Sequence, residues 1–98
     1  MSAQANHAAL QLGPELTIYS AAATRDALLG ALIAMGAGGT LTLDLGQVCE
    51  VDSAGVQVLL AARRHPGCTL ELHNHSGAVN DALALLGLDA QLAPLEAA

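Results

Sequence analysis

Two neighbouring side chains, Asp52 and Ser53, are the first place where this sequence could do chemistry. A serine nucleophile requires a histidine base and an oxyanion hole. The segment VDSAG (residues 51–55) does not have the G-x-S-x-G spacing of a hydrolase nucleophile, and no base stands beside it. A small domain with few clefts is also a poor enzyme. We therefore expect that this protein is not an enzyme and that the pair has another role.

One such role is to begin a helix, because an apolar run follows the pair. Asp and Ser are both preferred N-cap residues, since their side-chain oxygens accept the free N–H groups of the first helical turn. Loss of such a cap costs about 1 kcal/mol. The sequence alone leaves open whether Asp52 or Ser53 takes this position.

A further role for the pair is that of a switch. A phosphoryl group on Ser53 would add about −1.5 to −2 charges. That charge gains from the helix dipole and loses against Asp52, so the fold need not change. Ala54 and Gly55 leave room for another protein, and a partner packed there would meet a bulky dianion. An unfavourable contact of a few kcal/mol changes affinity about a hundredfold or more.

Histidines and cysteines form the next candidate site. His73 and His75 share one side of an extended chain, as the ligands of some metal sites do, and His65, Cys49 and Cys68 could complete a set. No pair has C-x-x-C or H-E-x-x-H spacing. We therefore expect polar residues in a loop and no metal. The cysteines are expected to be free thiols and small buried side chains rather than a disulfide.

The glycine-rich segment from Gly36 to Gly39 resembles a phosphate-binding loop only in composition. Such loops follow a strand, precede a helix and usually bring a lysine. This segment follows a predicted helix, and the chain has no lysine. We expect it to end the helix, and no cofactor is predicted.

Charge and hydropathy exclude other classes of partner. The net charge is −6, and the basic residues are only Arg25, Arg63 and Arg64. Nucleic acids and anionic membranes both require cations, so neither is an expected partner. No stretch reaches the roughly 18 apolar residues of a spanning helix, and direct membrane insertion is not expected. A cytoplasmic location is the expectation.

Periodicity locates the elements that must position these residues. The order is β-β-α-β-α-β-α in one domain of 98 residues. Alternation in residues 40–45 predicts a sheet covered by helices on one face only. Ser20 or Thr24 is expected to cap the first helix. The predicted strands are 10–12 and 16–19, as a hairpin or two short strands, then 40–45 and 68–73, and the predicted helices are 21–35, 54–64 and 76–86.

The segments LTLDLGQVCEVDSAGVQVLLAARR and HNHSGAVNDALALLGLDAQL together resemble a STAS domain, the family of anti-anti-sigma factors. The resemblance runs from about Leu10 to Leu92. It implies an α/β fold in a single domain over residues 1–98. In that fold a mixed four- to five-stranded sheet carries helices on one face, and residues 1–8 and 94–98 form flexible ends.

The resemblance also implies a function. In anti-anti-sigma factors, the hydroxyl residue that Ser53 matches is phosphorylated by a partner, a GHKL-type serine kinase that is itself the anti-sigma factor. Other relatives are small subunits bound to the ATPase of a lipid-transport ABC system, or accompany chemotaxis and two-component proteins. The implied partner surface consists of Asp52, Ser53, Ala54, Gly55, Val56 and Gln57.

Overall fold

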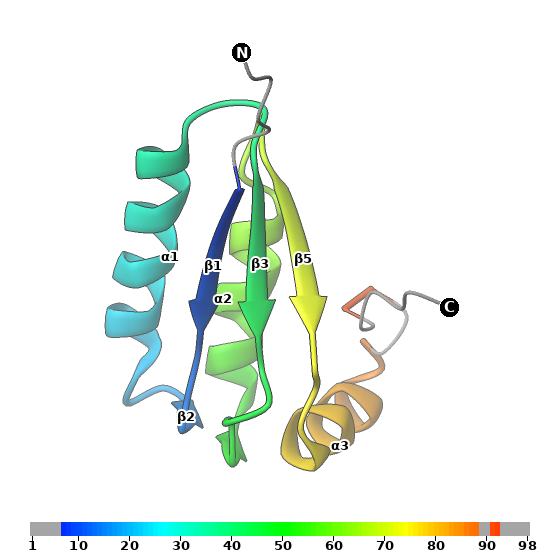
Figure 1. The fold of residues 1–98 in the computed structure, drawn as a ribbon. Coiled ribbons are helices and arrows are strands. Elements are labelled where there is room, and N and C mark those ends of the chain that lie inside the picture. Colours follow the sequence, from blue (N-terminus) through cyan, green and yellow to red (C-terminus); the bar gives the residue numbers. More distant parts are fainter. Residues whose placement is uncertain (1–6, 89–90, 93–98) are drawn as a thin grey trace.

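A computed structural model describes residues 7–88 and 91–92 (Figure 1). These residues form three helices and five strands, and each predicted helix is confirmed to within one residue at either end. The elements are β1 (His7–Gln11), β2 (Glu15–Leu16), α1 (Ala21–Met35), β3 (Thr40–Asp44), β4 (Glu50–Val51), α2 (Ser53–Arg63), β5 (Thr69–His73) and α3 (Gly77–Leu86).

The strands form two sheets, and both have only parallel pairs among the described residues. β3 is the central strand of a sheet with the order β1-β3-β5, and β2 pairs with β4 in a separate sheet. Each strand of the larger sheet is followed by a helical crossover before the next begins, which is the connection that parallel strands require. The predicted α/β class is confirmed, but the prediction of one mixed sheet is wrong.

For residues 10–12 and 16–19, the alternative of two short strands is confirmed and the hairpin is wrong. The chain after β1 does not turn back but continues alongside the segment that follows β3. Leu12 N donates to the carbonyl of Asp44 at 3.1 Å, and Cys49 N donates to the carbonyl of Pro14 at 2.8 Å. These long-range hydrogen bonds satisfy backbone groups that would have been paired within the hairpin. They also lead directly into the β2–β4 pair.

The core lies between the larger sheet and its helices. In Figure 1, α2 lies behind β3 and α1 lies to one side, so one face of the sheet is covered and the other carries no helix among the described residues. Leu41 and Leu43 point into the core, whereas Thr42 and Asp44 lie half-buried on the open face. The predicted alternation of β3 is therefore confirmed.

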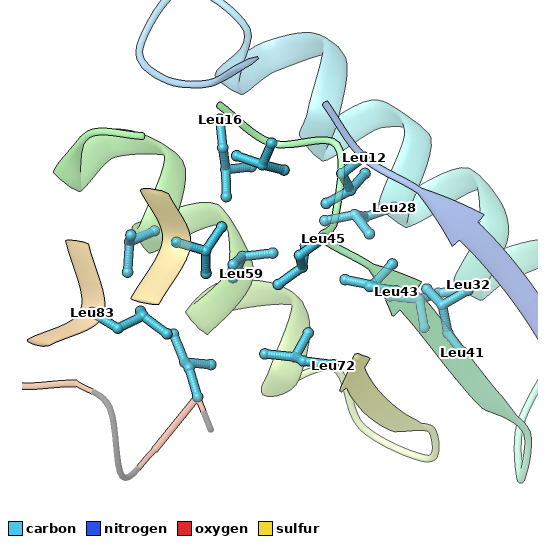
Figure 2. Packing of buried hydrophobic residues seen from close by; sticks show 14 residues of the cluster. Leu12, Leu16, Leu28, Leu32, Leu41, Leu43, Leu45, Leu59, Leu72 and Leu83 are labelled. Atoms are coloured by element: carbon cyan, nitrogen blue, oxygen red, sulfur yellow. The ribbon is translucent and has the colours of Figure 1, made fainter. Parts of the chain in front are cut away.

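Leucine and valine supply the whole buried cluster, which Figure 2 shows from close by. Each fully buried leucine contributes about 1.5–3 kcal/mol relative to an exposed one. The cluster consists of Leu12, Leu16, Leu28, Leu32, Leu41, Leu43, Leu45, Val48, Val56, Leu59, Leu72, Val79, Leu83 and Leu92. On α1, Leu28 and Leu32 face this cluster, but Leu29 and Ile33 point to solvent.

Two expectations about the ends fall mostly outside the described residues. His7 and Ala8 belong to β1 and pair with Thr40 and Leu41, so this part of the predicted flexible end is ordered strand. Near the C-terminal end, residues 91–92 are described, and Leu92 is fully buried. Residues 1–6 and 94–98 lie outside the described part of the chain.

Candidate functional site

The start of α2 is placed by β2 and β4. Asp52 directly follows β4, and its backbone N–H donates to the carbonyl of Leu16 at the end of β2, at 3.1 Å. Gly55, in the first turn of α2, packs against the same carbonyl. A Cβ at this position would overlap the backbone of Leu16, so only glycine permits this approach. The position of Ser53 is therefore fixed by the strand pair beneath it.

Asp52 is the N-cap of α2, and Ser53 is the first helical residue. The backbone of Asp52 is extended, and its Oδ1 accepts the N–H of Gly55 at 3.0 Å. Its Oδ2 accepts the N–H of Ile18 at 3.0 Å, from the loop between β2 and α1. One carboxylate thus caps the helix and fastens a loop that lies 34 positions earlier in the chain.

These hydrogen bonds favour the ionised carboxylate. The N–H of Ile18, followed by those of Gly55 and Ala54, holds the pKa of Asp52 below its ordinary value, against a smaller opposing effect of burial. Asp52 therefore carries its negative charge next to Ser53 throughout the physiological range.

Ser53 itself is exposed. None of the hydrogen bonds found within residues 7–88 and 91–92 involves its hydroxyl, since Asp52 already accepts the N–H that a serine cap would take. Of the predicted partner surface, Gln57 is also exposed, while Asp52 and Ala54 are half-buried. Gly55 and Val56, which complete the predicted surface, are buried beneath the first turn of α2.

A loop beside Ser53 was missed by the sequence reasoning. Ile18 and Tyr19 follow β2, and their side chains are 61% and 92% exposed. The hydrogen bond from Ile18 to Asp52 joins this loop to the start of α2. The available signal was that the chain's only aromatic residue stands between a strand and a helix.

The histidines do not converge. His73 Nε2 lies 3.4 Å from Glu71 Oε1, whereas His75 Nε2 lies 2.7 Å from the carbonyl oxygen of Leu92. Within the described ranges, no group of three histidine, cysteine or acidic side chains is placed to hold a metal ion. His75 is half-buried and is engaged in holding the C-terminal segment, which differs from the expected exposed loop residue.

The cysteines are free thiols, but one expectation about them is wrong. Cys49 is exposed, and its Sγ lies 3.5 Å from the carbonyl oxygen of Pro14. Cys68 is half-buried and lies 3.4 Å from the carbonyl oxygen of Gly36. Cys49 is at the surface because it lies in the connection between β3 and β4, whose buried side is taken by Val48.

One further expectation is resolved by the backbone. Gly36 ends α1, and its N–H donates to the carbonyl of Leu32 at 3.1 Å, which confirms the glycine segment as a helix end. No helix in the described part of the chain has the length and apolar character needed to cross a membrane.

Comparison with known proteins identifies the fold family. Residues 1–95 match the family model described as "Mlab, STAS domain". The chain belongs to the STAS domain family. A search of curated proteins found no match. The predicted family is thereby confirmed.

Two solved structures have the same fold as this STAS domain. One is the anti-sigma factor antagonist SpoIIAA in its unphosphorylated form, with a TM-score of 0.68 and 23% identity over 94% of this chain and 83% of that one. The other is a sulfate transporter family protein from Wolinella succinogenes, with a TM-score of 0.68 and 18% identity over 94% of this chain and 75% of that one. At these identities the likeness concerns the fold.

Proposed function

We propose that this STAS domain is a regulatory protein-binding module of the anti-sigma factor antagonist type, and that phosphorylation of Ser53 switches its binding. The observation that carries the proposal is that two neighbouring residues at the start of α2 have different roles. Asp52 caps the helix, and the hydroxyl of Ser53 is exposed and makes no hydrogen bond among the described residues. Such a hydroxyl can be modified without disturbing the structure.

The proposed modification is a phosphoryl transfer from ATP by a GHKL-type serine kinase that is also the anti-sigma factor. Ser53 Oγ attacks the γ-phosphorus, an O–P bond forms, ADP leaves, and the hydroxyl proton passes to a base of the kinase. This domain supplies the acceptor and no catalytic group. A cytoplasmic location follows from the need for ATP.

The charges around Ser53 explain how the switch would act. A phosphate there gains from the helix dipole and is repelled by Asp52. The basic residues Arg63 and Arg64 lie at the opposite end of α2 and cannot neutralise it. The fold therefore changes little, and the new charge acts on the partner.

The test is phosphorylation by the purified cognate GHKL-type serine kinase. With ATP, the wild type should gain one phosphate by intact mass, and Ser53→Ala should gain none. Ser76→Ala is the matched control, because Ser76 begins α3 but its hydroxyl is engaged as a cap, and this variant should still be phosphorylated. Phosphate on another residue would contradict the assignment.

The consequence for binding is measured separately. Ser53→Asp should bind the kinase at least about tenfold more weakly than the wild type, a change of about 1.4 kcal/mol. Isothermal titration calorimetry gives both affinities. Equal affinity would remove the switch and leave a binding module.

A second candidate is a constitutive subunit bound to the ATPase of a lipid-transport ABC system. It is favoured by the family description, which names Mlab and no sigma-factor regulator. Here Ser53 would pack unmodified in the interface. The domain should then co-purify with the ATPase in stoichiometric amount and carry no phosphate. An association with chemotaxis or two-component proteins would instead appear as binding to their components.

A further inference from the structure

The loop between β2 and α1 presents two large apolar side chains to solvent. Tyr19 is the only aromatic residue of the chain, and it lies at the surface with 92% of its area exposed. Its neighbour Ile18 is 61% exposed. The core contains no aromatic ring, and the single aromatic ring of the chain lies at the surface. Tyrosine is among the residues that most often dominate binding energy at protein interfaces.

This loop is held in one conformation by its own hydrogen bonds. Ile18 N donates to Asp52 Oδ2 at 3.0 Å, and Tyr19 N donates to Thr17 Oγ1 at 3.2 Å. Thr17 N donates to Ser20 Oγ at 3.0 Å, and Ser20 N donates back to the carbonyl of Thr17 at 3.1 Å. A rigid loop loses little conformational entropy on binding, so its exposed side chains are preorganised for a partner.

Two acidic residues lie opposite each other on neighbouring strands beside the loop. Glu15 and Glu50 are direct partners in the parallel β2–β4 register, and like charges at such positions destabilise a sheet. The chain has no lysine, and the arginine–carboxylate pair found among the described residues lies on α1. Glu15 also accepts the hydroxyl of Thr17 at 3.2 Å, which links this acidic pair to the apolar loop.

We propose that Ile18 and Tyr19 are the apolar anchor of the docking surface. The partner is a protein that offers them an apolar pocket with arginine or lysine side chains at its rim, opposite Glu15 and Glu50. The inference rests on the proposed function, which makes the start of α2 a docking site. A second copy of this chain is a poor occupant because both copies would bring the same two glutamates and a net charge of −6. An anionic membrane is repelled for the same reason.

The anchor also explains why a phosphate at Ser53 would weaken binding to a basic partner. Asp52 joins the anchor loop to the helix turn that carries Ser53, so the phosphate would lie at the edge of the apolar contact. The partner's cations are already occupied by the two glutamates. As the partner closes over Tyr19, the dianion loses its water without gaining a counter-charge.

The experiment measures the affinity of variants for a purified GHKL-type serine kinase, and for the purified ATPase of a lipid-transport ABC system, from the same organism. Tyr19→Ala should bind at least about tenfold more weakly, and Tyr19→Phe, which keeps the ring, should bind as the wild type does. Ile33→Ala is the matched control, because Ile33 is 72% exposed but lies near the far end of α1. The double variant Glu15→Gln, Glu50→Gln should bind with a weaker dependence on salt.

A footprint gives a second readout in the unaltered protein. Tyr19 is the only tyrosine, so nitration by tetranitromethane modifies one ring, and mass spectrometry of its peptide measures the rate. The bound partner should slow this reaction at least about tenfold, in line with full burial of an interface anchor.

The outcomes separate the two proposals. If Ser53→Asp weakens binding but Tyr19→Ala does not, the anchor is wrong and the proposed function stands. If Tyr19→Ala weakens binding and Ser53→Asp does not, the anchor stands and the switch is wrong. If neither protein binds the wild type, or the wild-type complex leaves nitration of Tyr19 unchanged, the anchor is overturned.

Discussion

α2 and α3 both begin with a side chain that accepts the N–H three residues later, but the two caps leave different groups free. At α2, Asp52 accepts from Gly55, and the following serine is exposed without a partner among the described residues. At α3, Ser76 accepts from Val79 at 3.2 Å, so its hydroxyl is itself the cap. Ser76 is the N-cap of α3, whereas Ser53 is the first residue of α2. The hydroxyl of Ser76 therefore stabilises its helix, and the hydroxyl of Ser53 remains available for modification.

The difference follows from what each cap can accept. A carboxylate has two oxygens, and Asp52 uses one for the helix and the other for the loop at Ile18. The hydroxyl of Ser76 accepts the N–H of Val79, and no second hydrogen bond of this hydroxyl is found among the described residues. The cap at Asp52 thus joins the helix start to the anchor loop, whereas the cap at Ser76 bonds only within its own helix.

The largest expected effect concerns the glycines of the two first turns. Gly55→Ala should lower the free energy of unfolding by about 3 kcal/mol, because the new methyl group overlaps the backbone of Leu16. Gly77→Ala, at the start of α3, meets no atom within 4 Å and should be neutral or stabilise by up to about 1 kcal/mol. Urea denaturation measures both. Equal stability of the two variants would mean that α2 is not seated against β2 as described.

An intermediate effect is expected from removing each serine hydroxyl. Ser76→Ala should cost about 1 kcal/mol because the N–H of Val79 loses its acceptor. Ser53→Ala should change stability by less than about 0.5 kcal/mol. The same denaturation measurement compares them. If Ser53→Ala lowers the free energy of unfolding as much as Ser76→Ala does, Ser53 is a cap as well, and the two serines do not differ in role.

The smallest effect is a difference in response to acid. The pKa of Asp52 is lowered in the folded state, so its contribution to stability is present above the pKa of the unfolded chain and is lost as the pH falls through the folded value. The amide shifts of Ile18 and Gly55 should move together with a midpoint below the about 3.9 of an ordinary aspartate, as followed by NMR. The amide of Val79, which is bonded to a hydroxyl, should not share this midpoint. A midpoint at or above the ordinary value would contradict the two hydrogen bonds that the carboxylate of Asp52 accepts.

Local pattern was enough to predict the helices and the two longer strands that follow them. The apolar spacing of Val56 and Leu59 and the alternation of Leu41 and Leu43 each depend on residues close in sequence. The glycine ends were equally local, since a glycine after the last helical turn carries its own signal. The start of α2 was located by the same means, because an Asp-Ser pair before an apolar run marks a helix start, whereas its interpretation as a site came from the family resemblance.

The parts that were mispredicted depend on contacts between distant segments. β2 has only two residues, and it becomes a strand because β4, more than thirty residues later, pairs with it. The second bond of Asp52, to Ile18, spans 34 positions and has no local signature. The sequence left open whether Tyr19 is buried or exposed, because tyrosine occurs in both settings, and only the completed fold places it at the surface.

The aromatic-free core also determines how this protein can be observed. Near-ultraviolet circular dichroism arises from rings held in fixed surroundings, and here the interior contains none. The emission of the single phenol, exposed before and after denaturation, should hardly change when the chain unfolds. Loss of the fold is therefore visible in the far ultraviolet through the helices, while the phenol signal remains free to report occupation of the surface on which it lies.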